Sequence, residues 1–474
     1  MKRMMWFTES IGLDTEIDSV RHKYQEEKGV AAAKISYNID YDKYGRISRR
    51  KGWEYTDVVS SCHSLFCGGG DCLFVSGDAL TLLGGDYTVK ELRNVTPNAP
   101  MSYQQVGPAV YYTNGTEKGA ILAGRSFNWD KPDTNYAKDT TKVWSGPPAG
   151  NMLAYHNGVM YVIQQHIAWH SEAYNVNLFN LTGGFLSFES PVSVFEGVTA
   201  GIWVCTESKI VFLRGTTPGN FAYERKATYG AVKGTGCLVD CALIGDGSIS
   251  GVGVMFVTKY GIALGTEKGE FIPITINRLR LPKVVSGSGI VTGGRYIATL
   301  ADSSSESRLV VSMNLNMTGV SQYNNYNFNS FCLFGDWAVG ASSSGLFKLD
   351  KTQRDVTSVT SNSPIESIYE SGPTDFGVRT DKRIQSCAVG LESNGPLVMT
   401  VKADEGLGDK VVRDKIPFFE DNRQHVVSVP FGRDTKGRYH SFILNNVNGA
   451  DFSIDYIEAF VVILNRKPER EGAN

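Results

Sequence analysis

Residues 158–170 read GVMYVIQQHIAWH, and residues 201–213 read GIWVCTESKIVFL. In each stretch a short apolar run is followed by a polar turn and a second apolar run, which is the pattern of a β-hairpin. The runs are rich in β-branched and aromatic residues, and neighbouring positions are both apolar. A strand with two apolar faces has to be covered on both sides, so these hairpins are expected between other sheets.

The same pattern recurs along most of the chain. The other units with this pattern are residues 71–83, 108–122, 253–265, 295–311 and 336–349. The first residues of successive units are about 37, 50, 43, 52, 42 and 41 residues apart. A repeat of this length with a hairpin in every unit is typical of β-propeller blades, because a single blade cannot bury both of its faces and stacks against its neighbours around an axis. The units predict six or seven blades, since one blade can be shared between the two ends of the chain. Two stacked β-sandwiches remain an alternative.

The pattern changes after the last unit. Residues 351–373 are rich in Ser, Thr and charge and contain Pro364, Gly372 and Pro373, which predicts a linker. Beyond it, apolar strand candidates return at residues 397–401, 425–429, 439–444 and 457–463. Several such strands in a short segment predict an antiparallel β-sandwich or jelly roll. The expected all-β organisation is an N-terminal arm and hairpin at 1–52, a propeller at 53–350, a linker at 351–373 and a sandwich at 374–474.

Composition narrows the functional classes. The chain has 474 residues with 47 Lys and Arg against 49 Asp and Glu, a net charge of −2. Dedicated nucleic-acid binders carry a large basic excess, so this class is not expected. The first residues carry no apolar signal region, and no run of about 20 apolar residues occurs. We therefore expect a soluble protein without a membrane anchor, made in a cytoplasm.

The cysteines and acidic residues give no clear reactive pattern. The eight cysteines are expected to be free buried thiols. Cys62, Cys67 and Cys72, with His63, form one cluster, but its spacing is wide for zinc and no second ligand pair lies nearby in the sequence. No nucleophile elbow or phosphate-binding loop occurs, and the carboxylates are scattered. The sequence thus predicts no metal, no cofactor, no catalytic residue and no enzymatic activity.

The N-terminal segment has a different character. Residues 29–53 read GVAAAKISYNIDYDKYGRISRRKGW, and Asp40 and Asp42 alternate with apolar neighbours as in a half-exposed strand. Gly45 turns the chain, and the basic stretch containing Arg46, Arg49 and Arg50 returns beside the acidic one. These five charged residues are predicted to contact a partner protein. The alternative is a solvated hairpin with ordinary cross-strand pairs.

Both ends of the chain resemble one protein family. The N-terminal segment is similar to an N-x-D…G-R-x-x-R-R-x-G motif through Asn38, Asp40, Asp42, Gly45, Arg46, Arg49, Arg50 and Gly52. The segment from Gly437 onward is similar to a terminal sandwich motif through Gly437, Arg438, Phe442, Leu444, Asn446, Gly449, Ala450, Phe452, Ile454 and Ile457. The family is that of tail hub or nozzle proteins of short-tailed bacteriophages, sometimes called DNA-stabilisation proteins.

The resemblance implies a structural protein of the virion, assembled in the bacterial host. Its expected form is a homo-oligomeric ring, with a hexamer favoured, docked to a tail adaptor and carrying fibre, spike or needle proteins. DNA would pass through the ring without sequence-specific binding, which suits a chain of nearly balanced charge. An alternative is a host-surface receptor binder in which Tyr369, Phe418, Phe419 and Tyr439 of the sandwich stack on glycans.

Overall fold

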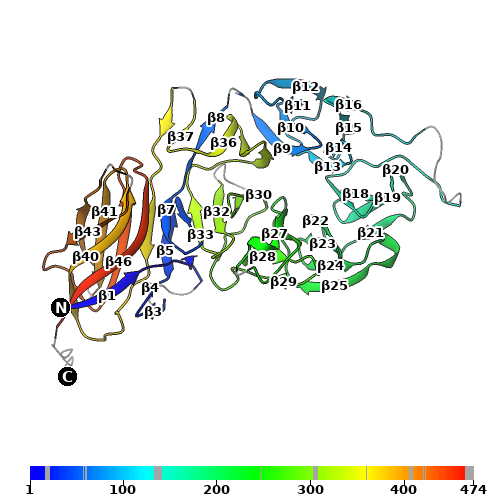
Figure 1. Ribbon diagram of the computed structural model, residues 1–474. Coiled ribbons are helices and arrows are strands. Elements are labelled where there is room, and N and C mark those ends of the chain that lie inside the picture. Colours follow the sequence, from blue (N-terminus) through cyan, green and yellow to red (C-terminus); the bar gives the residue numbers. More distant parts are fainter. Residues whose placement is uncertain are drawn as a thin grey trace, which may run out of the picture.

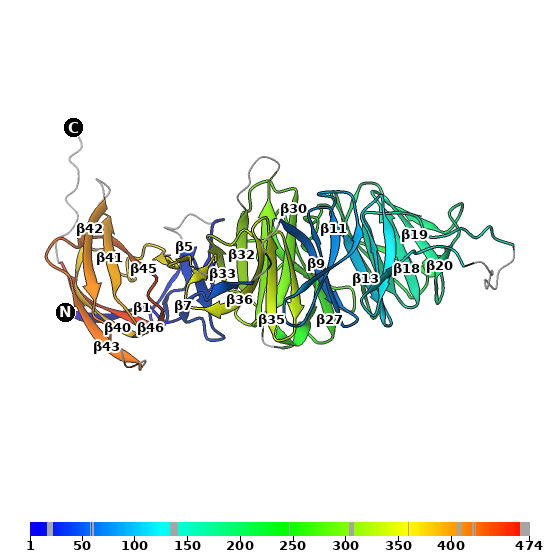
Figure 2. The same cartoon turned by 90° about the horizontal axis from the view of Figure 1, so that it is seen from above.

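The computed structural model describes the chain except for residues 17–21, 57, 59–60, 133–140, 246, 303–307, 359, 405–408, 420, 422 and 465–474. The regular structure of the described residues is β-strand, apart from two 3₁₀ helices, η2 (Pro218–Asn220) and η3 (Cys241–Leu243). A ring of sheets lies beside a sandwich, which contains both the first strand and the last strand of the chain (Figures 1 and 2). The all-β prediction is confirmed.

The ring is a β-propeller of seven four-stranded units. Five are separate four-stranded sheets, one is most of a five-stranded sheet, and one is part of a ten-stranded sheet. Blade 1 comprises β9 (Cys62–Gly68), β10 (Asp71–Ser76), β11 (Ala79–Leu83) and β12 (Val89–Asn94). Blade 2 comprises β13 (Ser102–Val106), β14 (Ala109–Thr113), β15 (Lys118–Leu122) and β16 (Arg125–Phe127). Blade 3 comprises β17 (Met152–His156), β18 (Val159–Gln164), β19 (Ile167–Glu172), β20 (Asn175–Phe179) and β21 (Phe185–Ser187).

The remaining blades continue in chain order. Blade 4 comprises β22 (Val192–Val198), β23 (Gly201–Thr206), β24 (Ile210–Arg214) and β25 (Ala222–Ala227). Blade 5 comprises β26 (Cys237–Asp240), β27 (Val252–Thr258), β28 (Gly261–Gly265) and β29 (Phe271–Ile272). Blade 6 comprises β30 (Ser286–Thr292), β31 (Arg295–Ala301), β32 (Leu309–Asn314) and β33 (Val320–Tyr323). Blade 7 comprises β34 (Ser330–Phe334), β35 (Trp337–Ser342), β36 (Gly345–Thr352) and β8 (Gly52–Tyr55).

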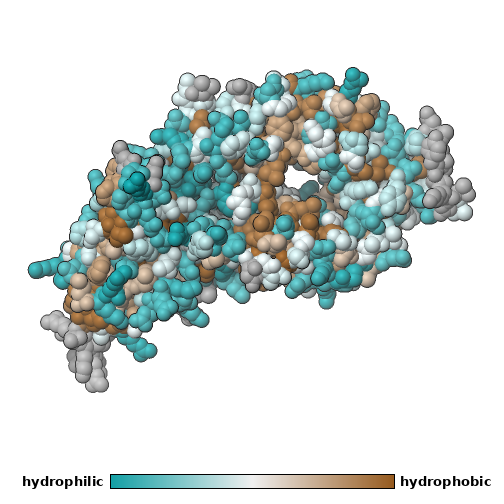
Figure 3. All heavy atoms as spheres, viewed as in Figure 1, coloured by the Kyte–Doolittle hydropathy of each residue, from teal (hydrophilic) through white to brown (hydrophobic). Residues whose placement is uncertain are grey.

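Strands from both ends of the propeller segment close the ring. The first strand of each blade contacts the next blade around the ring. The contacts run from β9 to β13, β17 and β22, then through β27 and β26 of blade 5 to β30, and from β34 back to β9. The outer strand of blade 7 is β8, which precedes blade 1 in the sequence and pairs antiparallel with β36. The last blade is therefore shared between distant parts of the chain, and Figure 3 shows the opening left along the ring axis.

The apolar sequence pattern explains why blades stack. In β18, Tyr161 packs toward blade 4, whereas Met160 and Val162 pack toward blade 2. All three side chains are fully buried. Each contributes about 2 kcal/mol by leaving water, so a blade without neighbours would lose most of its stabilisation. Each predicted hairpin contains the two middle strands of its blade.

The sandwich is built from both termini. One sheet contains β1 (Lys2–Phe7), β46 (Phe452–Ile463), β40 (Lys382–Ser393) and β43 (His425–Pro430), extended by β3 (Tyr24–Gln25), β4 (Gly29–Val30), β6 (Ile39–Tyr41), β7 (Ile47–Arg49) and β44 (Lys436–Gly437). The facing sheet contains β5 (Ala32–Tyr37), β39 (Ile368–Ser371), β45 (Tyr439–Asn446), β41 (Leu397–Asp404) and β42 (Asp409–Ile416). Aromatic rings fill the space between them: the Trp6 and Phe442 ring centroids are 5.2 Å apart, and those of Phe7 and Tyr369 are 5.6 Å apart.

One sheet runs from the propeller into the sandwich. The outer strand of blade 6, β33, pairs in parallel with β2 (Gly12–Leu13) and β5, and β5 pairs with β39 of the sandwich. Gly12 makes this possible. Its φ is +78°, and a Cβ atom there would lie 2.2 Å from the backbone nitrogen of Val320, so only glycine fits without distortion.

The structure changes two of the expected boundaries. The N-terminal segment 1–52 is not a separate arm, because β1, β2 and β5 are internal strands of shared sheets. Segment 351–373 is not a plain linker, since it contains the hairpin β37 (Asp355–Val356) and β38 (Asn362–Ser363) and the sandwich strand β39. The polar residues of β39 did not indicate a buried strand, because their hydrogen-bond partners lie far away in the sequence. Ser371 Oγ, for example, accepts a 3.1 Å hydrogen bond from the Phe442 amide.

Candidate functional site

The N-terminal hairpin β6–β7 lies where the propeller meets the sandwich. β6 pairs with β7, and β7 pairs with β46 of the sandwich sheet. Figure 1 shows β7 between the sandwich and blade 6. We call this region, formed by residues 38–50 and their contacts, the junction.

Asp40 connects the hairpin to blades 6 and 7 through Arg295. Nη1 of Arg295 donates to Asp40 Oδ2 over 2.6 Å and to the Tyr323 hydroxyl over 2.8 Å. The Tyr323 hydroxyl donates to the other oxygen of Asp40, and Nη2 of Arg295 pairs with Asp350 of blade 7. Burial lowers the pKa of Arg295, but the charges of Asp40 and Asp350 outweigh burial and raise the pKa well above its usual value. The guanidinium therefore stays charged between two carboxylates.

Arg50 forms a second buried ion pair. Its side chain is 1% exposed, and Nη1 and Nη2 donate to the two oxygens of Asp355 over 2.8 and 2.7 Å. Nε donates to Asn38 Oδ1 over 2.9 Å, and the guanidinium carbon lies 5.6 and 5.5 Å from the ring centroids of Tyr323 and Tyr326. A bidentate pair between aromatic faces fixes the orientation of the guanidinium as well as neutralising it.

The other three predicted residues have different environments. The Arg49 side chain is 0% exposed; its Nη1 donates to the Gln353 carbonyl over 2.8 Å, and its Nε pairs with Asp451 over 3.3 Å. Asp42 accepts hydrogen bonds from backbone amides of its own turn, including that of Arg46 over 2.9 Å. Arg46 pairs with Asp455 over 2.7 Å, with 46% of its side chain exposed.

These positions correct the predicted partner contacts. Arg49 and Arg50 cannot meet a partner protein, because their charges are buried and paired within the chain. The Asp40 side chain is 18% exposed, and its charge is paired with Arg295. Asp42 shapes the turn. Arg46 stays a predicted contact, since it is half exposed beside Tyr44, which is 60% exposed at the tip of the hairpin. The sequence could not show that Asp40, Arg49 and Arg50 are paired with residues of the same chain.

A second feature is a cavity of about 690 Å³ at one end of the propeller. It lies where β17, β22 and β30 begin, and turns from blades 3 to 6 line it. Lys233, Lys259 and Lys283 are three cations of its lining, against one carboxylate, Glu207. The sequence did not indicate this cavity, because its residues come from turns that are far apart in the chain.

The cysteine prediction is wrong for one pair. Cys67 and Cys72 are directly opposed in β9 and β10 and form a disulfide. Their spacing in the sequence places them on either side of a tight hairpin turn, which the sequence interpretation did not take into account. Six cysteines are free, as predicted. Five of them are buried, namely Cys62, Cys205, Cys241, Cys332 and Cys387, whereas Cys237 is partly exposed.

The aromatic residues suggested for glycan stacking do not form one surface. Tyr369 is fully buried in the sandwich core, where its ring stacks on Phe442. Phe418 and Phe419 are exposed by 37% and 47%, and Phe419 stacks on His425 at 4.1 Å between ring centroids. Tyr369 is therefore removed from the predicted group.

No family model and no curated protein matches this chain. Among solved structures, the extracellular domain of a putative one-component system from B. thetaiotaomicron is similar at 10% identity with a TM-score of 0.40; the match covers 63% of this chain and 39% of that one. An exo-β-1,3-galactanase from Phanerochaete chrysosporium is similar at 10% identity and a TM-score of 0.25, over 77% of this chain and 97% of that one. The Neurospora crassa Pan2 WD40 domain is similar at 8% identity and a TM-score of 0.35, over 62% and 90%.

One prediction made from the sequence is withdrawn. The sequence predicted that the chain is not an enzyme, yet the galactanase is one. A fold does not determine function, so the prediction that the chain lacks enzymatic activity is withdrawn. Separately, none of the helices among the described residues is long and apolar enough to cross a membrane.

Proposed function

We propose that the chain is a structural component of a bacteriophage tail. It would be a hub or nozzle subunit that forms part of the DNA-ejection conduit and a docking platform for other tail proteins. The observation that carries the proposal is the ten-stranded sheet shared by propeller and sandwich, whose connecting strands come from the N-terminal segment. Domains of one chain ordinarily move relative to each other, but a shared sheet prevents this. A rigid subunit suits a ring that must keep its shape while DNA passes.

The motif that carries the family resemblance supports the proposal. Its residues Asn38, Asp40, Arg49 and Arg50 are those that join the hairpin to the propeller and the sandwich. Asn38 also donates to the Glu366 carbonyl over 2.6 Å. The resemblance therefore concerns the residues that set the angle between the two parts of the molecule.

The charge balance is also suited to a conduit. With 47 basic and 49 acidic residues, the chain offers no large cationic excess to hold DNA phosphates. Each phosphate neutralised by a basic residue adds to affinity and would slow passage. In this proposal DNA passes along the axis of the oligomeric ring, between subunits, and not through the opening of a single propeller.

The tip of the N-terminal hairpin is the proposed contact for a neighbouring tail protein. Tyr44 is 60% exposed, and the Lys43 amine lies 4.9 Å from its ring centroid. An exposed aromatic residue flanked by cations is a common anchor in protein interfaces. Tyr44→Ala should reduce incorporation of the chain into particles about tenfold or more, because the anchor is lost while the fold is not.

The matched control for this variant is Tyr223→Ala. Tyr223 is similarly exposed, at 56%, but lies on the outer strand of blade 4. Incorporation is measured by quantitative blotting of purified particles. Equal incorporation of Tyr44→Ala and the wild-type chain would remove the tip from the interface.

The proposed function is tested in the phage that encodes the chain. A nonsense mutation early in the gene should give heads that package DNA but lose it, and a plasmid copy of the chain should restore filled particles. The readout is the fraction of DNA-filled heads in electron micrographs. Filled and infectious particles that lack the chain would contradict the proposal.

A further inference from the structure

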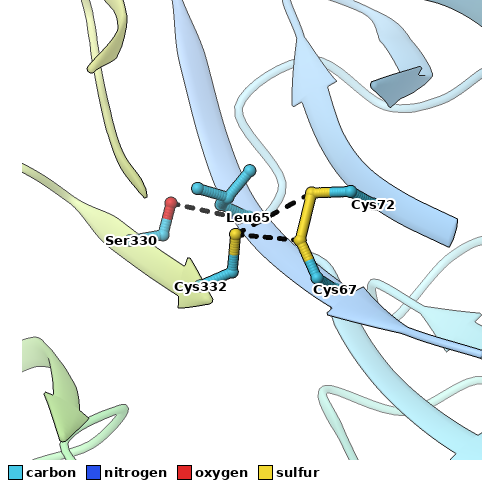
Figure 4. The surroundings of a disulfide bond; sticks show 5 residues. All are labelled: Leu65, Cys67, Cys72, Ser330 and Cys332. Carbon is cyan, nitrogen blue, oxygen red and sulfur yellow. Dashed lines mark hydrogen bonds between the residues drawn. A yellow bond between two sulfur atoms is a disulfide. The ribbon is translucent and has the colours of Figure 1, made fainter. Parts of the chain in front are cut away.

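Three sulfur atoms meet where the first and last blades touch. The Cys67–Cys72 disulfide belongs to blade 1, and the free Cys332 lies on β34 of blade 7 (Figure 4). The Cys332 Sγ atom is 3.0 Å from Cys67 Sγ and 3.8 Å from Cys72 Sγ. The thiol therefore contacts both sulfurs of the disulfide.

We propose that this cluster is a thiol–disulfide exchange site at which the bridge moves from Cys67–Cys72 to Cys67–Cys332. The Cys332 thiol loses its proton, and its sulfur attacks Cys67 Sγ. The Cys67–Cys72 bond breaks, and its electron pair goes to Cys72, which takes up a proton. One disulfide and one thiol are present before and after, so the step consumes no oxidant or reductant.

The move changes what the bridge connects. The Cys67–Cys72 bond spans 5 residues within one hairpin. A Cys67–Cys332 bond would span 265 residues and join blade 1 to blade 7 covalently. The two ends of the propeller segment meet here, where β34 contacts β9 and β36 pairs with β8, so this is where the ring could open. A long-range bridge also restricts the unfolded chain far more than a local one does.

The surroundings make the exchange slow at neutral pH. Apolar residues of both blades enclose the cluster, among them Val58, Phe74, Val339 and Leu346. Burial raises the pKa of the Cys332 thiol well above its usual value, so the attacking thiolate is scarce. Cys67 is only half-buried, which leaves one sulfur within reach of small thiols. The rate of exchange should therefore rise with pH.

The experiment uses the full chain equilibrated with a trace of glutathione at pH 7 and pH 9, trapped by alkylation. Disulfides are mapped by mass spectrometry, and the denatured protein is run on a non-reducing gel. The wild-type chain should show both the 67–72 and 67–332 bridges, with the second approached faster at pH 9. Molecules with the long bridge should migrate faster, because their denatured form is more compact.

Two variants separate the outcomes. Cys72→Ser has two thiols in place of a thiol and a disulfide, so it is equilibrated with oxidised glutathione as the two-electron oxidant and should then carry the 67–332 bridge in most molecules. Cys332→Ser should carry only the local bridge. If Cys72→Ser does not fold, the wild-type mapping still decides. Finding only the 67–72 bridge at both pH values, with Cys67 and Cys332 alkylated in Cys72→Ser, would overturn the proposal. Tight Zn²⁺ binding by the reduced chain without any 67–332 bridge would also overturn it, in favour of a metal site.

Discussion

Arg50 and Arg295 carry positive charge into the junction, and both are almost completely enclosed. Each is paired with a carboxylate from the end of the propeller segment, Asp355 for Arg50 and Asp350 for Arg295. A buried ion pair adds little net stability compared with an apolar pair, but breaking it leaves an uncompensated charge. At the residue scale, these pairs therefore fix how the hairpin is seated.

Removing one partner of the buried pair tests this role. Asp355→Asn should lower the free energy of unfolding by about 3 to 5 kcal/mol, because Arg50 would stay buried without its counter-charge. The control is Arg46→Gln, which removes a half-exposed pair and should cost less than about 1 kcal/mol. Urea unfolding gives both values. Similar small losses for the two variants would contradict the role assigned to Arg50.

His440 gives the sandwich a dependence on pH. The side chain is fully buried, and Nε2 donates to the Thr435 carbonyl over 2.9 Å. Burial, together with the nearby Lys382 charge, lowers its pKa from 6.5 to about 4. Between these two values the unfolded chain binds more protons than the folded one, so stability is lost as the pH falls from 6.5 to 4.

The contribution of His440 should reach about 2 to 3 kcal/mol at pH 4.5. His440→Gln keeps a donor for the Thr435 carbonyl but does not titrate. The variant should therefore lose less stability than the wild-type chain between pH 7 and pH 4.5, by that amount, in urea unfolding. Identical pH profiles for the two proteins would show that His440 is not the group responsible.

At the scale of elements, the sequence was informative where strands are buried on both faces. The predicted hairpins are the middle strands of the blades, such as β18 and β23, whose positions are nearly all buried. The outer strand β12 was not predicted, since five of its six residues are exposed and the strand carries no apolar period. The strand β39 was taken for linker because buried Ser and Glu residues are satisfied by partners that only the fold brings near.

The sequence predicted the hairpin of the junction but not the orientation of its charged side chains. The alternation of Asp40 and Asp42 with apolar residues predicted the hairpin, and β6 and β7 confirm it. The inward orientation of Arg49 and Arg50 depends on Asp451 and Asp355, about 300 to 400 residues away in the chain. No local pattern could have shown this.

The connection between β2 and blade 6 should be sensitive to a single methyl group. Gly12→Ala places a Cβ against the Val320 backbone at positive φ, and should lower stability by about 2 kcal/mol or more beyond the control. The control is Gly77→Ala, whose φ is also positive at +62° but which has no atom within 4 Å of the added carbon. Urea unfolding compares the two variants. Equal losses would mean that the close approach of β2 to β33 is not required.

At the scale of the whole molecule, the chain is a closed ring fused to a sandwich that both termini build. β1 pairs with β46 near the chain ends, and β8 closes blade 7. Removing residues 1–52 would therefore take strands out of both sheets of the sandwich, so point variants at the hairpin tip are better tests of partner contacts than a deletion. The fused form supports the proposal of a rigid ring subunit in a tail.

Electron cryomicroscopy of the virion tests the central proposal most directly. The account predicts a ring of copies on the tail axis, six being favoured by the family resemblance, with the propeller and sandwich of each copy side by side as in Figure 2. The DNA path should run between the subunits along that axis. Particles whose tails contain no density for this fold, or contain it only as single copies away from the axis, would contradict it.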